Sequence, residues 1–206
     1  MSRFKTLKTH TYLFYVASSL LVFGLSAIVA IKHTSPSFEK SIFDFIYGWS
    51  DILKPFFWTI TQLGGTWVLL AGIGIFYWQK KKNLALKLFI GGMLTYSTVQ
   101  IAKVLIDRPR PYLLFSEVIS RDSLVAGLGF PSGHTALITF FGIILQPYLH
   151  KRWRWTTWVV IVLVAISRIY LGVHAPLDVI GGFALGAIVA YTVRYLLQRR
   201  FHSHSA

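Results

Sequence analysis

Long apolar windows constrain this chain more than any other feature of its sequence. Five of them hold about 18 or more residues, the length at which a helix rising about 1.5 Å per residue spans a bilayer core about 30 Å thick. A sixth window is shorter and becomes long enough only if it continues past Arg168. The six windows are 12–31, 55–78, 84–106, 130–149, 155–170 and 177–197. With a mean hydropathy of +0.57, the sequence predicts an all-α integral membrane bundle of six transmembrane helices.

The first window resembles a secretory signal only superficially. Its apolar run is too long for a signal peptide, and no convincing small-x-small cleavage site follows it. We therefore expect a retained membrane helix. No linker, repeat or low-complexity segment divides the chain, so residues 1–206 are predicted to form a single domain.

The distribution of charge predicts the orientation in the membrane. If the amino terminus is cytoplasmic, the segments on that side hold 13 of the 21 Lys and Arg residues and none of the seven acids. These segments are 1–11, 79–87, 150–154 and 194–206. The positive-inside rule then predicts a multi-pass protein of the cell membrane with both termini cytoplasmic. The net charge of +14 reflects this topology and attraction to anionic lipids, and no nucleic-acid partner is expected because short loops offer no groove-sized basic surface.

The segment between the first two windows has the pattern of an amphipathic helix. Ser35 can cap a helix whose first residue is Pro36. Apolar residues then recur at intervals of three and four, namely Phe38, Ile42, Phe45, Trp49 and Leu53. This pattern predicts a short extracytoplasmic helix lying on the outer leaflet. Its role is either packing or forming the wall of a lipid entrance.

The third window ends in the polar sequence KVLIDRPRP. Lys103 lies in the last turn of an apolar helix, where a charge is costly enough to indicate a function, with snorkelling to the interface as the alternative. Pro109 and Pro111 disfavour helical conformation at Arg108 and Arg110 and hold the segment extended. An extended arginine can turn its planar guanidinium toward an oxyanion.

The fourth window opens with PSGH. Pro131 suits the first turn of a helix, and Gly133 permits a ligand to approach the backbone closely. Free N–H groups at a helix start favour an anion. The motif also fits an ordinary loop, but His134 adds a group able to move a proton near neutral pH.

The fifth and sixth windows are joined by SRIYLGVHAPLD. His174 and Asp178 are four residues apart, so a helix starting near Pro176 would bring them together on one face. A carboxylate there can fix the imidazole tautomer and leave the other nitrogen for nucleophilic attack. The alternative is a His–Asp pair that only satisfies itself at a helix end.

All three polar segments fall on the outer side of the predicted topology. Together they contain a candidate nucleophile, an acid to orient it, a second histidine and three cations, Lys103, Arg110 and Arg168. These are the parts needed for phosphoryl transfer, in which catalysis is mainly positioning and charge stabilisation. No cluster of carboxylates suited to magnesium is present, and the absence of cysteine excludes thiolate metal sites, so no metal or other cofactor is predicted.

With these motifs the sequence resembles the type 2 phosphatidic acid phosphatase superfamily. The signatures of that family are Lys-x6-Arg-Pro, Pro-Ser-Gly-His and Ser-Arg-x5-His-x3-Asp. All three occur in full within residues 103–178 of this chain. The resemblance implies that His174 attacks phosphorus to form a phosphohistidine, with Asp178 orienting it. His134 would act as general acid and base. The implied phosphate-binding residues are Lys103, Arg110, Ser132, Gly133 and Arg168.

The resemblance also implies the class of substrate. An outer-face site points to a phospholipid or polyprenyl phosphate in the bilayer. Similarity to bacterial members of the phosphatidylglycerophosphatase B type implies phosphatidylglycerophosphate, with undecaprenyl diphosphate and phosphatidic acid as alternatives. Transfer to another alcohol instead of water stays open, whereas a related vanadium haloperoxidase would be soluble. A non-catalytic lipid transporter or scaffold would fit six helices but would have no need of the catalytic residues, and the sequence makes no prediction of oligomeric state.

Overall fold

The computed structural model describes residues 8–33, 35–122 and 127–202, with side chains described up to 196. Within these ranges the chain is helical and contains no strand. Its α-helices are α1 (Thr9–Ala30), α2 (Ser37–Tyr47), α3 (Lys54–Gln62), α4 (Thr66–Trp78), α5 (Lys82–Ile106), α6 (Pro111–Leu114), α7 (Gly133–Leu145), α8 (Arg154–Tyr170) and α9 (Pro176–His202). Short 3-10 turns lie at Asp51–Leu53, Gln146–Tyr148 and Lys151–Trp153.

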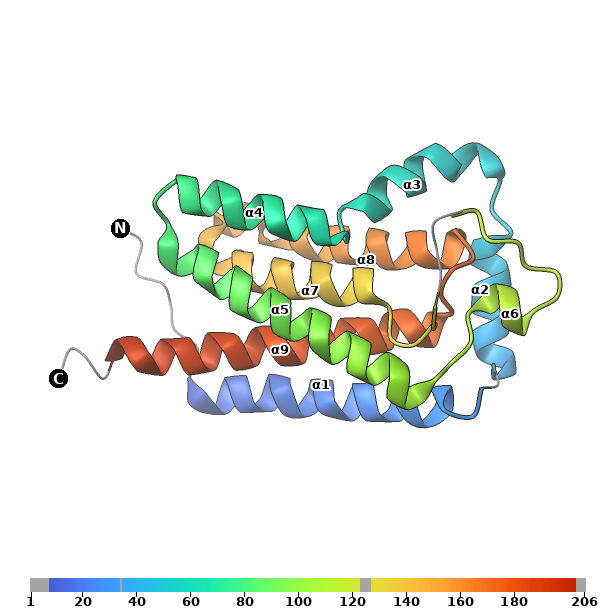
Figure 1. The fold of residues 1–206 in the computed structure, drawn as a ribbon, viewed down its shortest axis with the longest axis horizontal. Helices are drawn as coiled ribbons and strands as arrows, with labels where there is room; N and C mark the ends of the chain where they lie inside the picture. Colours follow the sequence, from blue (N-terminus) through green and yellow to red (C-terminus); the bar gives the residue numbers. More distant parts are fainter. Residues whose placement is uncertain (1–7, 34, 123–126, 203–206) are drawn as a thin grey trace.

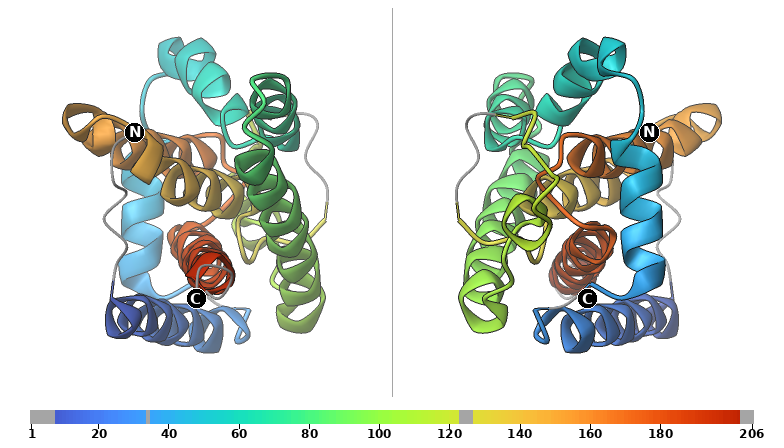
Figure 2. Two further views of the ribbon diagram at one scale, coloured as in Figure 1. Left: turned by 90° about the vertical axis from the view of Figure 1, so that its left-hand side faces the viewer. Right: turned by 90° about the vertical axis from the view of Figure 1, so that its right-hand side faces the viewer.

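Helices α1, α4, α5, α7, α8 and α9 run along the long axis of the molecule, and α2 crosses one end of them (Figure 1). Figure 2, seen along that axis, shows α9 in the middle, with α1, α2 and α5 around it. The burial of the helices agrees with this arrangement, because 72% of the most apolar window of α9 is buried inside the protein, against 11% for α1. The connections from α1 to α3, from α5 to α7 and from α8 to α9 all lie at the end where α2 crosses.

Within the part of the chain that the structure describes, three helices are long and apolar enough to cross a membrane by themselves. They are α1, the segment that starts with α5, and α9, and a fourth span is possible if α3 and α4 count as one bent element. Helices α7 and α8 hold 13 and 17 residues. Residues 155–170, the short predicted window, end as helix at Tyr170 and continue past Arg168 by only two residues.

The second predicted window is broken, which its apolar composition did not indicate. Helices α3 and α4 meet at an angle of 45° across residues 63–65. The backbone at Gly64 lies so close to α7 that a Cβ there would stand 2.9 Å from the Cβ of His134. A pair of glycines, Gly64 and Gly65, permits this approach and weakens the helix at the same point.

Helices α7 and α9 pack closely through small residues. A Cβ at Gly182 would meet the carbonyl oxygen of Ser132 at 2.4 Å, and one at Gly186 would meet that of Ala136 at 2.3 Å. The spacing of these two glycines is typical of close helix contacts in membranes. The contact brings the start of α7 against the first turns of α9.

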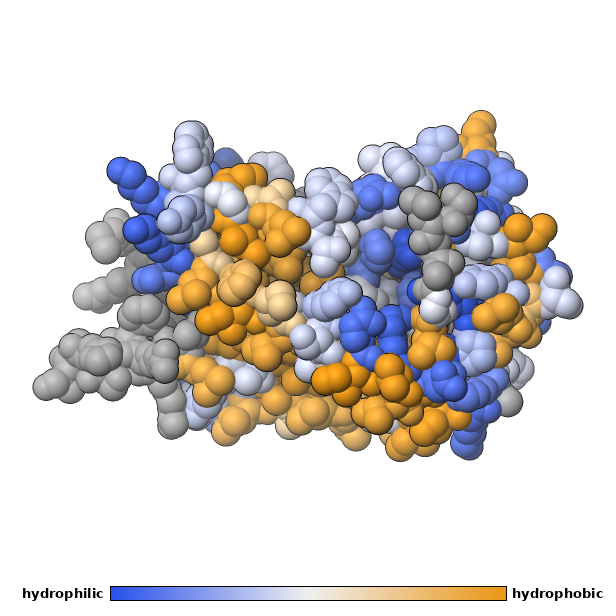
Figure 3. Space-filling model, viewed as in Figure 1, coloured by the Kyte–Doolittle hydropathy of each residue, from blue (hydrophilic) through white to orange (hydrophobic). Residues whose placement is uncertain are grey.

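Large apolar side chains cover the outside of the helices. On α1, Leu21 and Phe14 are 64% and 66% exposed, and on α5, Val104 is 74% exposed. Figure 3 shows apolar residues over the helices and hydrophilic residues gathered at the end where α2 crosses. Such a surface is stable against lipid and not against water. The protein is therefore a membrane protein.

Helix α2 is amphipathic, but it begins later and ends earlier than the sequence pattern predicted. Its N-cap is Pro36, without a side-chain cap, and its first residue is Ser37. The Ser35 hydroxyl instead donates to Oε2 of Glu39 at 2.7 Å. The predicted apolar stripe is exposed at its first three positions, Phe38, Ile42 and Phe45, whereas Trp49 and Leu53 follow the end of the helix.

Candidate active site

The three polar segments come together around one cavity at the end where α2 crosses. The cavity has a volume of about 230 Å³. Six of the eight predicted site residues line it, namely Lys103, Arg110, Gly133, His134, Arg168 and His174. The rest of the lining comes from Gly64 and Thr66 at the α3–α4 break, from Tyr96, Val99 and Gln100 on α5, and from Leu137 on α7. Cationic and neutral polar groups thus face the apolar side chains of Val99 and Leu137 across the cavity, as in a site for an amphiphile.

The end of α5 places two of the cations. Asp107 adopts a left-handed conformation (φ 50°) that ends the helix, and the prolines keep the following residues extended. Lys103 donates to the carbonyl oxygen of Leu128. The guanidinium of Arg110 donates to the carbonyl oxygens of Gly127 at 2.9 Å and Val173 at 3.0 Å.

The start of α7 carries the PSGH motif. Ser132 is the N-cap, and its hydroxyl oxygen accepts a hydrogen bond from the Thr135 hydroxyl at 3.1 Å. This side chain is fully buried and does not line the cavity. Gly133 and His134, the first residues of the helix, do line it. Because Gly133 lines the cavity and Ser132 does not, the phosphate-binding role of Ser132 stays a prediction.

The end of α8 supplies the third cation. Arg168 donates to the Thr61 hydroxyl at 2.9 Å, and its Nη1 lies 3.5 Å from Oδ2 of Asp122. The guanidinium is almost fully buried. The connection from α8 to α9 then turns His174 toward the cavity.

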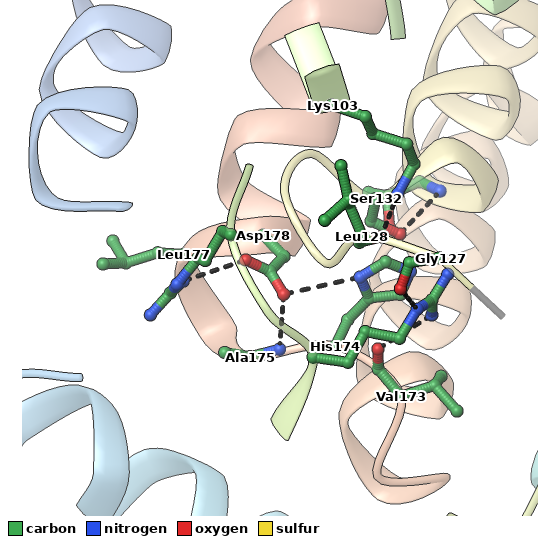
Figure 4. Close-up of polar contacts among 12 residues, drawn as sticks. Lys103, Gly127, Leu128, Ser132, Val173, His174, Ala175, Leu177 and Asp178 are labelled. Carbon is green, nitrogen blue, oxygen red and sulfur yellow. Dashed lines mark hydrogen bonds and ion pairs between the residues drawn. The ribbon is translucent and has the colours of Figure 1, made fainter. Parts of the chain in front are cut away.

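His174 and Asp178 meet as their spacing predicted. Nδ1 of His174 lies 3.4 Å from Oδ2 of Asp178, and Figure 4 shows this contact together with the hydrogen bond from the Ala175 amide to the same oxygen at 2.8 Å. A separation of 3.4 Å is long for a hydrogen bond, and such contacts in sites without substrate tighten when substrate binds. Burial holds the pKa of the His174 imidazole well below its usual 6.5, and the charges of nearby cations lower it further.

Two further residues of the site were missed by the sequence reasoning. Arg108 is fully buried, and its guanidinium lies between Asp178 and Glu39 of α2 instead of facing the cavity. In the sequence, Glu39 precedes the apolar Phe43 by four residues, which places the two on one face of α2, and the structure buries both fully. The predicted apolar stripe lies on a different face of α2 and therefore did not indicate Glu39.

Helix α2 does not form a wall of the cavity. Among the described residues, none of those that line it belongs to α2. The side chain of Phe43 instead packs with Val118, Ile169 and Val179. The structure thus shows a packing role for α2, and its part in forming a lipid entrance stays a prediction.

The described residues contain no cluster of side chains suited to binding a metal ion. No set of three or more histidine, cysteine, aspartate or glutamate side chains gathers there. Positive charge at the cavity comes from Lys103, Arg110 and Arg168.

Comparison with known proteins assigns the chain to a family. A family model described as the PAP2 superfamily matches residues 84–202. Phosphatidylglycerophosphatase B of Bacillus subtilis is 33% identical over 150 residues, which cover 66% of this chain and 70% of that protein. The chain belongs to the PAP2 superfamily. The resemblance predicted from the three motifs is thereby confirmed.

Other PAP2 proteins are similar over much of the chain. Undecaprenyl-diphosphatase of Sulfolobus acidocaldarius is 26% identical over 126 residues, covering 61% of this chain and 60% of that protein. The crystal structure of a transmembrane PAP2 type phosphatidylglycerolphosphate phosphatase from Bacillus subtilis matches with a TM-score of 0.72 and 27% identity, covering 90% of this chain and 97% of that one. The chain is a PAP2-type lipid phosphatase, and its relatives differ in the lipid that their names give.

Proposed function

We propose that this protein removes phosphate from a lipid phosphomonoester or diphosphate at the outer face of the cytoplasmic membrane, through a phosphohistidine on His174. One observation carries the proposal. The imidazole of His174 has a carboxylate against Nδ1 and faces a cavity lined by three cations and a second histidine. That arrangement supplies a nucleophile, its orienting acid, charge stabilisation and a proton carrier.

The reaction has two steps. With Nδ1 directed to Asp178, Nε2 of His174 attacks phosphorus, and the bond from phosphorus to the lipid oxygen breaks. His134 gives that oxygen its proton. His134 then takes a proton from water, whose oxygen displaces His174 from phosphorus, and orthophosphate leaves. Lys103, Arg110 and Arg168, with the backbone around Ser132 and Gly133, stabilise the equatorial oxygens in both transition states.

The proposed topology has six spans, formed by α1, the bent pair α3 and α4, α5, α7, α8 and α9. The predicted cytoplasmic loops 79–87 and 150–154 lie at the end opposite the one where α2 crosses (Figure 1). Arg3 and Lys5, which contribute to the charge count of the amino-terminal segment, lie outside the described residues. This distribution supports cytoplasmic termini and an extracytoplasmic site.

Phosphatidylglycerophosphate is the first candidate substrate, because the relative with 33% identity and the matching crystal structure both carry that activity in their names. Undecaprenyl diphosphate is the second candidate, favoured by the archaeal relative. Purified protein in detergent should be given phosphatidylglycerophosphate, undecaprenyl diphosphate and phosphatidic acid in parallel, and kcat/KM for phosphate release compared. A highest value for either of the last two would overturn the first assignment.

The chemical step is tested by replacing the nucleophile. His174→Asn should reduce phosphate release to the uncatalysed background and abolish the alkali-stable phosphoenzyme trapped by rapid quenching. His150→Asn is the matched control, because His150 is an exposed histidine in the connection between α7 and α8 and does not line the cavity, and it should keep wild-type turnover. Near-normal turnover by folded His174→Asn protein would overturn the mechanism and leave the transporter or scaffold alternative.

A further inference from the structure

A buried chain of three charged side chains lies behind His174, on the side away from the cavity. Nη2 of Arg108 donates to Oε2 of Glu39 at 2.7 Å, and Nη1 donates to Oε1 of Glu39 at 3.1 Å and to Oδ1 of Asp178 at 2.9 Å. All three side chains are fully buried. They come from α2, the segment after α5, and α9, so the chain joins three elements that are distant in sequence.

Burying these charges is costly, because each loses its hydration. The cost is offset only where geometry is good and the remaining hydrogen-bonding positions are filled. Here Glu39 also accepts hydrogen bonds from the Leu177 amide at 3.0 Å and the Ser35 hydroxyl at 2.7 Å. Such a network contributes little net stability compared with apolar packing, so stability alone does not account for it.

We propose that Glu39 and Arg108 are positioning residues for the reaction, acting through Asp178 on His174. This inference rests on the proposed function, in which His174 is the nucleophile and Asp178 orients it. Neither residue lines the cavity, so neither is expected to touch substrate. Their effect is on the rate of the chemical step.

The geometry gives the pair two tasks. Arg108 holds Oδ1 of Asp178, which turns Oδ2 toward the imidazole. Glu39 fixes Arg108 and also fixes the first turn of α9 through the Leu177 amide, next to Asp178 in the chain. The carboxylate, the helix start and the arginine are therefore held as one unit.

Charge gives Glu39 a separate effect. Arg108 alone would cancel the negative charge of Asp178, which must stabilise the positive imidazole ring of the phosphoenzyme. With Glu39 present, the three side chains carry a net charge of −1 behind a ring that faces cations on its other side. Besides Glu39 and Arg108, the charged and titratable groups around His174 are Asp178, Lys103, Arg110, Arg168 and His134.

Helix α2 provides a matched control for the loss of Glu39. Asp44 lies five residues further along the same helix, where its half-exposed side chain pairs with Lys40 at 2.9 Å. Glu39→Gln and Asp44→Asn remove the same charge with almost no change of shape. We expect Glu39→Gln to lower kcat about tenfold, as for other residues that orient a reacting group through a neighbour, with KM within about twofold of wild type. Asp44→Asn should change neither constant.

Two readouts separate positioning from a merely structural role. The acidic limb of the pH profile of kcat/KM should move to lower pH in Glu39→Gln, because the ring loses part of the negative charge that favours its protonation. In an Asp178→Asn background Glu39→Gln should have little further effect on kcat, because the carboxylate through which Glu39 acts is absent. Independent, multiplying effects of the two substitutions, or an unmoved acidic limb, would overturn the proposal.

A second variant covers the case in which Glu39→Gln does not fold. Glu39→Leu combined with Arg108→Met replaces one ion pair by apolar side chains of similar volume, a change that folded proteins often tolerate, while Asp178 keeps its charge and its hydrogen bond from the Ala175 amide. It should fold and lose kcat by about tenfold or more. Wild-type kcat in this variant would overturn the proposal. If His174→Asn is inactive while the Glu39 variants turn over normally, this inference fails alone, whereas an active His174→Asn protein refutes the proposed function itself.

Discussion

The two sides of His174 differ in the sign and surroundings of their charges. The front, toward the cavity, carries Lys103, Arg110 and Arg168. The back carries Asp178 and Glu39, joined by Arg108. An anionic substrate and a developing positive ring need opposite charges, and the fold supplies each on its own side.

The partners of the two arginines illustrate this difference. Arg110, on the front, donates to the backbone carbonyl oxygens of Gly127 and Val173. Arg108, two residues earlier, donates to the carboxylates of Glu39 and Asp178. Neutral carbonyl oxygens orient an arginine without cancelling its positive charge. Two carboxylates that bind the same arginine cancel that charge, and the arginine holds them in position. Residue type alone therefore does not assign an arginine to the substrate.

The largest expected effect comes from the back. Asp178→Asn should reduce kcat by about 10³-fold or more, because an amide can hold the imidazole in the wrong tautomer and cannot stabilise its charge. KM should change little. Steady-state kinetics with the melting temperature as a folding control would test this, and a loss confined to KM would contradict the division into two sides.

A smaller effect is expected at the front. Arg110→Gln should lower kcat/KM by about 10²-fold through lost charge stabilisation of the transferring group. It should also weaken inhibition by orthophosphate, whereas Asp178→Asn should not. Inhibition constants for orthophosphate measured on both variants would sharpen the comparison, and equal weakening in the two would contradict it.

Protonation of His174 should differ from that of an ordinary histidine. Because burial and the front cations lower its pKa below 6.5, the ring should stay neutral and nucleophilic at pH 6.5 and take up a proton only as the pH falls further. An NMR titration of labelled histidine in detergent, with the His174→Asn variant for assignment, measures this directly. A midpoint at or above pH 6.5 would show that, in the enzyme without substrate, the negative charges behind the imidazole affect its pKa more than burial and the cations on the cavity side.

No effect is expected from chelation. Since side chains provide the positive charge on the front, EDTA should leave kcat/KM unchanged, with phosphate release from the purified protein as the measurement. Loss of activity that magnesium restores would mean that the cavity needs a metal ion in addition to its three cationic side chains.

Much of the site could be predicted because its residues are close in sequence or share a helix. His174 lies two residues before α9 and Asp178 in its first turn, so a short stretch of chain joins them, and the prolines around Arg110 restrict the backbone locally. The spacing of Gly182 and Gly186 is a local pattern of the same kind, and the structure shows the close helix contact of which that spacing is typical. The roles assigned to these side chains stay predictions until the variants are measured.

Other features depended on contacts that local patterns do not encode. The break between α3 and α4 depends on how closely Gly64 approaches His134. Ser132 matches its motif, yet its hydroxyl turns to Thr135 inside the bundle. The first residue of α2 was also predicted wrongly, because Ser35 contacts Glu39 instead of capping the helix.

The sequence by itself determined the apolar helices, the outward side of α2 and the polar segments that meet at one end of the bundle, because hydrophobic burial and helical periodicity act over short distances along the chain. Only the tertiary structure decided which arginine faces the cavity and that Glu39 lies behind the nucleophile. The physical reason is that a buried charge is stabilised by a partner that is close in space, and local sequence patterns do not identify a partner that is distant along the chain. For Glu39 and Arg108 that partner is 69 residues away in sequence and 2.7 Å away in the folded protein.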